Sequence, residues 1–177
     1  MSREKVSVRK VWAPDLAHMD TALDDINAKV IVLQAGTRDI NKIEVEEMNE
    51  KIVDLVEKAL TKADKVVIST IVNRDDIVDI NLKVNSVNCF MLLTYTRNEN
   101  VIVCDNSTWY HRDFHTADKL HLSEEGTSAL ASNLKYAMAE AADVRVVKKK
   151  PNTSNYSNQR RRYRGNRHSD YYRNSYW

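Results

Sequence analysis

An aspartate and a histidine three positions apart, Asp118 and His121, are the pair in this sequence best suited to proton transfer. They stand just ahead of a helical pattern, in a stretch expected to be a loop. There the carboxylate can fold back onto one imidazole nitrogen, which fixes the tautomer and leaves the other nitrogen as a base. The alternative is a turn-capping aspartate beside an exposed histidine. We interpret the spacing as the Asp-His half of a hydrolytic triad.

A second candidate group follows an apolar run at residues 30–33, where the chain reads Gly36-Thr-Arg38-Asp39. Gly36 allows a tight turn, and the polar residues after it lie where a strand would end. Ligands of open parallel sheets bind beyond the carboxyl ends of the strands. The loop is therefore a candidate binding site, and the alternative is a strand-to-helix turn without a ligand.

The elements that would position these residues follow from hydrophobic periodicity. Buried, mostly β-branched runs predict strands at residues 30–33, 65–70 and 101–104, and looser alternation predicts a strand at residues 5–12. Helical spacing predicts helices at residues 15–27, 41–62 and 123–142, and another marked by Ile77 to Met91, with Asp15 and Ser123 at two helix starts. This alternation favours an α/β fold with a parallel sheet and helices on both faces. Polar residues at 36–39, 73–75 and 105–107 would then share one rim.

Several of these segments together resemble the SGNH (GDSL-like) hydrolase family, in particular the SGNH domains in open reading frames of some animal retroelements. The similar stretches are residues 32–39 (Val-Leu-Gln-Ala-Gly-Thr-Arg-Asp), 69–75 (Ser-Thr-Ile-Val-Asn-Arg-Asp), Asn85 and 118–126 (Asp-Lys-Leu-His-Leu-Ser-Glu-Glu-Gly). The resemblance covers roughly residues 5–138. It implies a three-layer α/β/α fold of the SGNH or flavodoxin-like type, and cleavage of esters of lipids, carbohydrates or other small acyl groups.

The resemblance also implies roles for individual residues. Asp118 and His121 fall on the pair that activates the family's nucleophilic serine. Gly36 and Asp39 fall on the Gly and Asp of the Gly-x-Asn-Asp block, whose Asn contributes to the oxyanion hole, but Arg38 stands at that Asn. A long, charged side chain does not reproduce a short amide donor.

The family's nucleophile lies in a Gly-Asp-Ser turn, and this sequence contains none. We expect an N-terminally truncated version of the fold that lacks its first strand. A base without its nucleophile does no acyl transfer, so we expect little or no esterase activity. The hypothesis is a degenerate SGNH-like domain, and the alternatives are an active esterase using a serine not recognised here and a protein-interaction module.

The charge of the chain is divided unevenly. The net charge of +2 combines −6 over residues 1–147 with +8 over residues 148–177. The second segment has almost no aliphatic residue, so we expect a domain at 1–147 followed by a disordered tail. Its arginines and tyrosines suit phosphate contact and base stacking on single-stranded RNA or DNA. The candidate contacts are Arg160, Arg161, Arg162, Tyr163, Arg164 and Arg167. The alternatives are a solubilising tail and a nuclear-import signal.

Other features narrow the class of protein. The two cysteines, Cys89 and Cys104, indicate a reduced core rather than a disulfide frame, and no leader or membrane segment is recognisable, so we expect a cytoplasmic or nuclear protein with no membrane partner. His111, Asp113 and His115 alternate, but nothing else supports a metal site, and we expect no metal or cofactor. Arg74 and Asp75 are interpreted as a solvated ion pair rather than a brace. The oligomeric state is left open.

Overall fold

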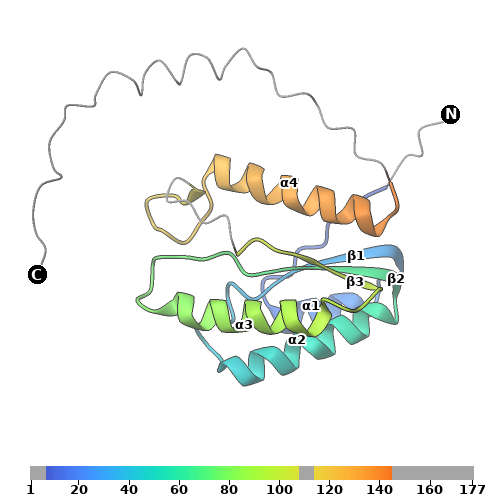
Figure 1. Cartoon of the computed structure of the whole chain (residues 1–177), viewed down its shortest axis with the longest axis horizontal. Coiled ribbons are helices and arrows are strands. Elements are labelled where there is room, and N and C mark those ends of the chain that lie inside the picture. The colour runs from blue at the N-terminus through green and yellow to red at the C-terminus, as the bar shows by residue number, and fades with distance from the viewer. Residues whose placement is uncertain (1–6, 108–113, 145–177) are drawn as a thin grey trace, which may run out of the picture. The chain divides into compact units, whose positions relative to one another are not determined.

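The computed structural model describes residues 7–107 and 114–144. The chain divides into two units, residues 1–146 and 147–177, and every feature below belongs to the first. Its helices are α1 (Leu16–Leu23), α2 (Val45–Leu60), α3 (Ile80–Tyr95) and α4 (Glu124–Ala141), and its strands are β1 (Ala28–Gln34), β2 (Ala63–Ser69) and β3 (Val101–Cys104) (Figure 1). The predicted disorder of the tail concerns residues outside the described range.

The three strands form one parallel sheet in the order β1-β2-β3. Ile31 pairs with Val66, and Val67 pairs with Ile102. All three predicted buried strands are present, each within two residues of the expected ends. The expected parallel α/β fold is therefore confirmed, and the truncation of its first strand stays a prediction.

The strand predicted at residues 5–12 is wrong for the part that the structure describes. Residues 7–12 form no ladder, and Val8 and Trp12 are exposed. Alternation predicts a strand only where one face is buried, and here the apolar side chains face solvent. Among the described residues, β1 therefore has a neighbour on one side only.

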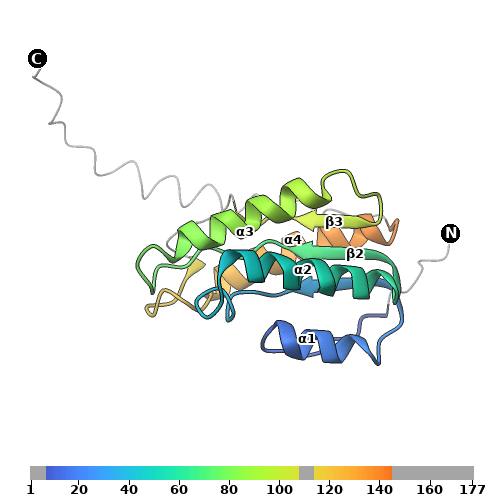
Figure 2. The same cartoon turned by 90° about the horizontal axis from the view of Figure 1, so that it is seen from below.

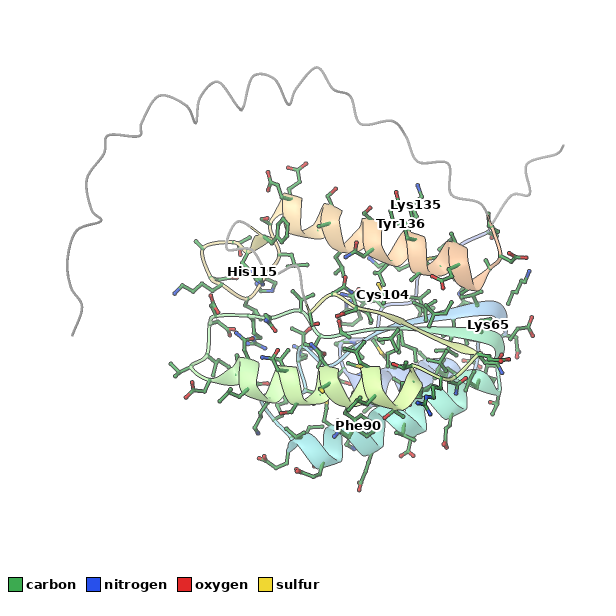
Figure 3. The ribbon with its side chains drawn as sticks, in the orientation of Figure 1. Lys65, Phe90, Cys104, His115, Lys135 and Tyr136 are labelled. Atoms are coloured by element: carbon green, nitrogen blue, oxygen red, sulfur yellow. The ribbon has the colours of Figure 1, made fainter. Side chains whose placement is uncertain are left out.

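Helices cover both faces of the sheet, as expected. Helices α2 and α3, with α1 beside α2, lie on one face, and α4 lies on the other (Figures 1 and 2). The larger core lies on the side of α1 to α3 and includes Met48, Val66 and Val84. The smaller core contains Val67 and Cys104, and Cys104 lies between β3 and α4 (Figure 3).

The helices end or begin at residues that differ from the sequence expectation for α1 and α3, whereas α4 begins where it was predicted. Helix α1 begins after Asp15, whose side chain accepts from the His18 amide, but it ends at Leu23, four residues early. Helix α3 begins at Ile80 rather than Ile77, because Asp79 has a left-handed conformation with φ 59°. Helix α4 begins after Ser123, which accepts from the Gly126 amide as predicted.

A buried side-chain amide fixes the rotation of α3. The Asn88 side chain accepts from the Ile71 amide and donates to the Ile71 carbonyl, both at 2.8 Å, and Asn88 is 2% exposed. These bonds satisfy two backbone groups in the segment that leaves β2. The neighbouring Cys89 consequently points to solvent, so the expectation of two core cysteines is wrong for Cys89 and correct for Cys104.

We predict that Asn88→Ala lowers the free energy of unfolding by about 2–4 kcal/mol. The substitution leaves both Ile71 groups buried without their partner, and each such loss costs about 1–3 kcal/mol. The matched control is Asn85→Ala, an exposed asparagine on the same helix, for which the change is within about 0.5 kcal/mol. Urea denaturation of both variants measures the difference, and equal effects contradict the assignment.

Candidate functional site

The Asp118–His121 pair forms as the spacing predicted. The Nδ1 atom of His121 lies 2.6 Å from Oδ2 of Asp118. The carboxylate can only accept at neutral pH, so we assign the proton to Nδ1 and the lone pair to Nε2. The ring is exposed, with 74% of the side-chain surface accessible. Within the described residues, Nε2 has no hydrogen-bond partner, and it is therefore available to take a proton from a bound molecule.

The other oxygen of Asp118 is held by its own loop. Oδ1 accepts from the Thr116 hydroxyl at 2.7 Å and from the backbone amides of Leu120 and His121 at 2.9 Å each. The Thr116 amide donates to the His121 carbonyl at 2.8 Å, and Lys119 closes the turn with φ 60°. Oδ1 of Asp118 is thus held by the Thr116 hydroxyl and by the backbone. Oδ2 bonds to the imidazole of His121 and sets the orientation of the ring.

These hydrogen bonds hold the pKa of Asp118 well below its ordinary range. The largest cause is the bond to the His121 ring, followed by the Thr116 hydroxyl and the backbone amides. Each of them stabilises the charged form. Asp118 therefore stays ionised wherever the protein is folded under ordinary conditions, as an orienting carboxylate must.

The same Asp-x-x-His spacing occurs a second time and was missed by sequence reasoning. The Nδ1 atom of His18 lies 2.6 Å from Oδ1 of Asp15 at the start of α1. That oxygen also accepts from the His18 amide, so the aspartate is a helix cap. The two pairs differ in that Asp118 keeps one oxygen for the imidazole alone, whereas Asp15 uses one oxygen for both bonds.

Arg74 connects the loops at the carboxyl end of the sheet. It is only 5% exposed. Its guanidinium donates twice to Asp76 and once to the Thr37 carbonyl at 2.7 Å. The bidentate bond keeps the pKa of Asp76 below its ordinary value. The interpretation as a solvated Arg74–Asp75 ion pair was wrong, because the described ion-pair partner of Arg74 is Asp76 and the Arg74 side chain is buried.

The next residue extends this connection to the candidate base. The Asp75 amide donates to the Lys119 carbonyl at 3.1 Å. Residues 74 and 75 therefore join the loop after β1 to the loop that carries Asp118 and His121. A single short segment thus brings the two candidate groups to the same rim, where its own bonds connect the two loops.

The loop after β1 is fixed largely for structural reasons. Gly36 has φ +99°, a backbone conformation that other residues adopt only with strain, so the position favours glycine. Oδ2 of Asp39 accepts from the Leu16 amide at 3.2 Å, which binds the first turn of α1 to the rim. Arg38 is exposed. Their predicted role in binding an oxyanion or substrate stays a prediction.

A polar network at the ends of β2 and β3 was expected at an open rim but is buried. The Asn106 side chain donates to the Ser69 hydroxyl at 2.9 Å and accepts from Asn133 of α4 at 2.9 Å. Its backbone amide donates to the Thr70 hydroxyl at 2.6 Å. The sequence placed Asn106 at the rim without this burial, since its partners lie 27 to 37 residues away.

A shallow hollow of about 430 Å³ lies beside this site. Its lining is largely polar: it includes Lys119 from the loop of the candidate base, Asp75, Asp76 and Asp79 from the segment before α3, and Asn85 of α3. Of the alternating metal candidates, His111 and Asp113 lie outside the described residues, and within the described ranges no cluster of three metal-ligating side chains occurs. In the same ranges no helix is long and apolar enough to cross a membrane.

We predict that His121→Ala raises the pKa of Asp118 toward its ordinary value, because the largest cause of the depression is removed. The hydrogen bonds from Thr116 and from the backbone amides remain, so the pKa of Asp118 stays partly lowered. The carboxyl-carbon chemical shift followed by NMR across acidic pH measures the change. The pKa of Asp15, lowered chiefly by His18, is the internal control and does not move.

The lowered pKa of Asp118 makes the free energy of unfolding depend on pH. A carboxyl whose folded pKa is lowered stabilises the fold above its unfolded pKa, near 4, and this contribution is lost as pH falls toward the folded value. The difference in unfolding free energy between wild type and Asp118→Asn is therefore present at neutral pH and shrinks on acidification. A difference that grows below about pH 4 contradicts this.

Comparison with known proteins gives structural matches only. No protein-family model matches the sequence, and no curated protein matches it. Among solved structures, a member of the lipolytic protein G-D-S-L family from Veillonella parvula is 23% identical, with a TM-score of 0.59, over 69% of this chain and 73% of that one.

Two further structures agree. A GDSL-like lipase from Bacteroides thetaiotaomicron is 17% identical, with a TM-score of 0.61, over 71% of this chain and 69% of that one. A carbohydrate esterase of family 3 from Talaromyces cellulolyticus is 14% identical, with a TM-score of 0.53, over 66% and 60% of the two chains. The parallel sheet with flanking helices described above therefore has an SGNH-like (GDSL-type) fold, as the resemblance in the sequence predicted.

Proposed function

We propose that this chain is a degenerate SGNH hydrolase-like domain of a mobile-element reading frame, which keeps the base of the hydrolytic site and lacks its nucleophile. The observation that carries the proposal is the bond between Asp118 and the His121 ring, with Nε2 exposed and unengaged in the described residues. An oriented imidazole at the rim is the arrangement that deprotonates a hydroxyl.

Three features support impairment rather than full activity. The sequence contains no Gly-Asp-Ser. Arg38 occupies the place of the family's oxyanion-binding Asn, and Asp39 is engaged by the Leu16 amide at the start of α1. Removing a single oxyanion donor costs about 10²–10³ in kcat, and losing the nucleophile removes the acyl-enzyme route altogether.

The solved relatives indicate the substrate class if a nucleophile were available. They are described as lipolytic proteins, a lipase and a carbohydrate esterase. We infer that this site descends from one that cleaves carboxylic esters. Asp118 would orient His121, and His121 would take the hydroxyl proton as the nucleophile attacks the ester carbonyl and return it to the leaving alcohol.

We predict that the full chain does not react with a fluorophosphonate probe, because such probes phosphonylate only an activated serine. In-gel fluorescence measures labelling, with a known serine esterase treated in parallel as the positive control. Labelling of the wild type that is lost in His121→Ala would overturn the proposed impairment and favour the active esterase instead. Labelling that survives His121→Ala would contradict a role for this base.

We further propose that residues 148–177 bind single-stranded nucleic acid. The support is compositional: the segment carries +8 with interleaved tyrosines, while residues 1–147 carry −6. Arginine contacts phosphates and stacks on bases, and tyrosine offers stacking faces. A sequence-tolerant contact of this kind depends on counterion release, so its affinity falls steeply with salt.

We predict that neutralising Arg160, Arg161 and Arg162 to Gln weakens binding to a labelled single-stranded RNA. Each phosphate contact contributes about 0.7 to the slope of log affinity against log salt, so three lost contacts reduce that slope by about 2. Fluorescence anisotropy at several salt concentrations measures it.

The control for this experiment neutralises three lysines of the folded domain instead. They are Lys29, Lys42 and Lys51, all exposed. If the control weakens RNA binding as much as the tail variant does, the domain rather than the tail carries the affinity. If the wild-type protein does not bind RNA, the protein-interaction alternative is favoured.

A further inference from the structure

The loop of the candidate base is a short hairpin that leads into α4. His115 (Figure 3) pairs with Leu122 in an antiparallel bridge, and the Ser123 amide donates to the Phe114 carbonyl at 2.8 Å. These contacts form a stem at the two ends of the loop. Residues 117–120 form the tip between them, so the tip depends on other contacts for its position.

The stem is seated on the first turn of α4 by Gly126. A Cβ at this position would lie 2.1 Å from the Phe114 carbonyl oxygen, which is a backbone atom and cannot swing aside as a side chain could. The Gly126 amide donates to the Ser123 hydroxyl at 3.1 Å, and the Ser123 amide binds the same Phe114 carbonyl. The stem is therefore fixed to the helix by its backbone.

Inside the hairpin, three groups of Thr116 bond to the turn that carries the base. The hydroxyl donates to Oδ1 of Asp118 at 2.7 Å. The amide donates to the His121 carbonyl at 2.8 Å, and the carbonyl accepts from the Lys119 amide at 3.0 Å. Because two of these bonds belong to the backbone, the hydroxyl bond can be removed by substitution while the turn keeps its other contacts.

The tip is supported from α3 through Asn81. The side-chain oxygen of Asn81 accepts from the Arg74 amide at 3.0 Å, and its nitrogen donates to the Arg74 carbonyl at 2.7 Å. The Asp75 amide then donates to the Lys119 carbonyl at 3.1 Å. The Arg74 carbonyl and the Asp75 amide belong to one planar peptide group, so the bond to Asn81 directs that amide toward the tip.

The same chemistry joins α3 to this segment a second time. Asn88 binds both backbone groups of Ile71, and Asn81, about two helical turns earlier on the same face, binds both backbone groups of Arg74. The segment that leaves β2 is thus held along α3 at both of its ends. Its last peptide group is as firmly placed as the helix itself.

We propose that Thr116 and Asn81 are positioning residues of the candidate base and act by two separable routes. Thr116 fixes the orientation of the His121 imidazole through the carboxylate beside it. Asn81 fixes the place of the tip relative to the loop after β1, to which Arg74 is bonded. The role of His121 as a base rests on the proposed function, whereas both positions can be measured without a substrate.

The first test measures the orientation of the imidazole by NMR of the full chain. After the bond to His121, the Thr116 hydroxyl is the largest cause of the lowered pKa of Asp118. Thr116→Val therefore raises this pKa and reduces the Nδ1-protonated tautomer of His121, which the nitrogen chemical shifts of the ring report. Thr116→Ser keeps the hydroxyl and restores both values. Thr127→Val, at an exposed position of α4, changes neither.

The second test measures the place of the tip. A nitroxide is attached to Arg38→Cys in a Cys89→Ser background, since the other cysteine is buried. It broadens the imidazole proton signals of His121 by an amount that depends steeply on distance. Asn81→Ala changes this broadening and leaves the tautomer of the first test unchanged, because the bonds within the hairpin remain. Ser86→Ala, an exposed serine of the same helix, changes neither readout.

The pattern across the variants separates positioning from a general loss of structure. A variant that only destabilises the domain alters both readouts together. The proposal is overturned if Thr116→Val leaves the tautomer unchanged or Thr116→Ser fails to restore it, if Asn81→Ala leaves the broadening unchanged, or if each variant alters both readouts. None of these results changes the outcome of fluorophosphonate labelling, so failure of the positioning roles is distinguishable from failure of the proposed function.

Discussion

The buried guanidinium of Arg74 is the contact on which the geometry of the rim depends. It neutralises Asp76 and satisfies the Thr37 carbonyl, while the following residue binds the Lys119 carbonyl through its backbone. A charge this deeply buried is tolerated only with complete pairing, since an unpaired one costs several kcal/mol. The loop after β1 and the loop of Asp118 and His121 therefore keep their relative positions through one side chain and one peptide bond.

The site around Arg74 contains both buried and exposed polar groups. The ends of β2 and β3 are closed by the bonds of Asn106 to Ser69 and Asn133. By contrast, the imidazole of His121 is exposed, and its orientation comes entirely from a short loop whose carboxylate is bound by its own backbone. Such a loop keeps its proton-accepting geometry through hydrogen bonds among residues 116–121, so the orientation of the imidazole does not depend on a neighbouring catalytic side chain.

Local sequence patterns predicted most helices and strands. The features that they did not predict depend on contacts between residues far apart in the sequence. A short, mostly β-branched run such as Val30 to Leu33 favours a strand, and Ser123 is a strong helix cap, so both were found. Residues 5–12 alternate equally well but have no buried face in the described part. The burial of Arg74 was missed because its carbonyl partner, Thr37, lies 37 residues away. The Asp118–His121 pair was found because the bonds that orient it lie within one short loop, residues 116–121.

Among the described residues, one side of β1 is left without a neighbouring strand, and this carries a cost. In the described ranges this strand hydrogen-bonds to β2 alone, and its outward amides and carbonyls can template the addition of any extended chain. Apolar residues such as Val30 and Val32 are only half-buried beside it. We therefore expect recombinant protein to aggregate through the unpaired edge of β1. The rate of this β-aggregation would increase with temperature, and the helices would not take part in it.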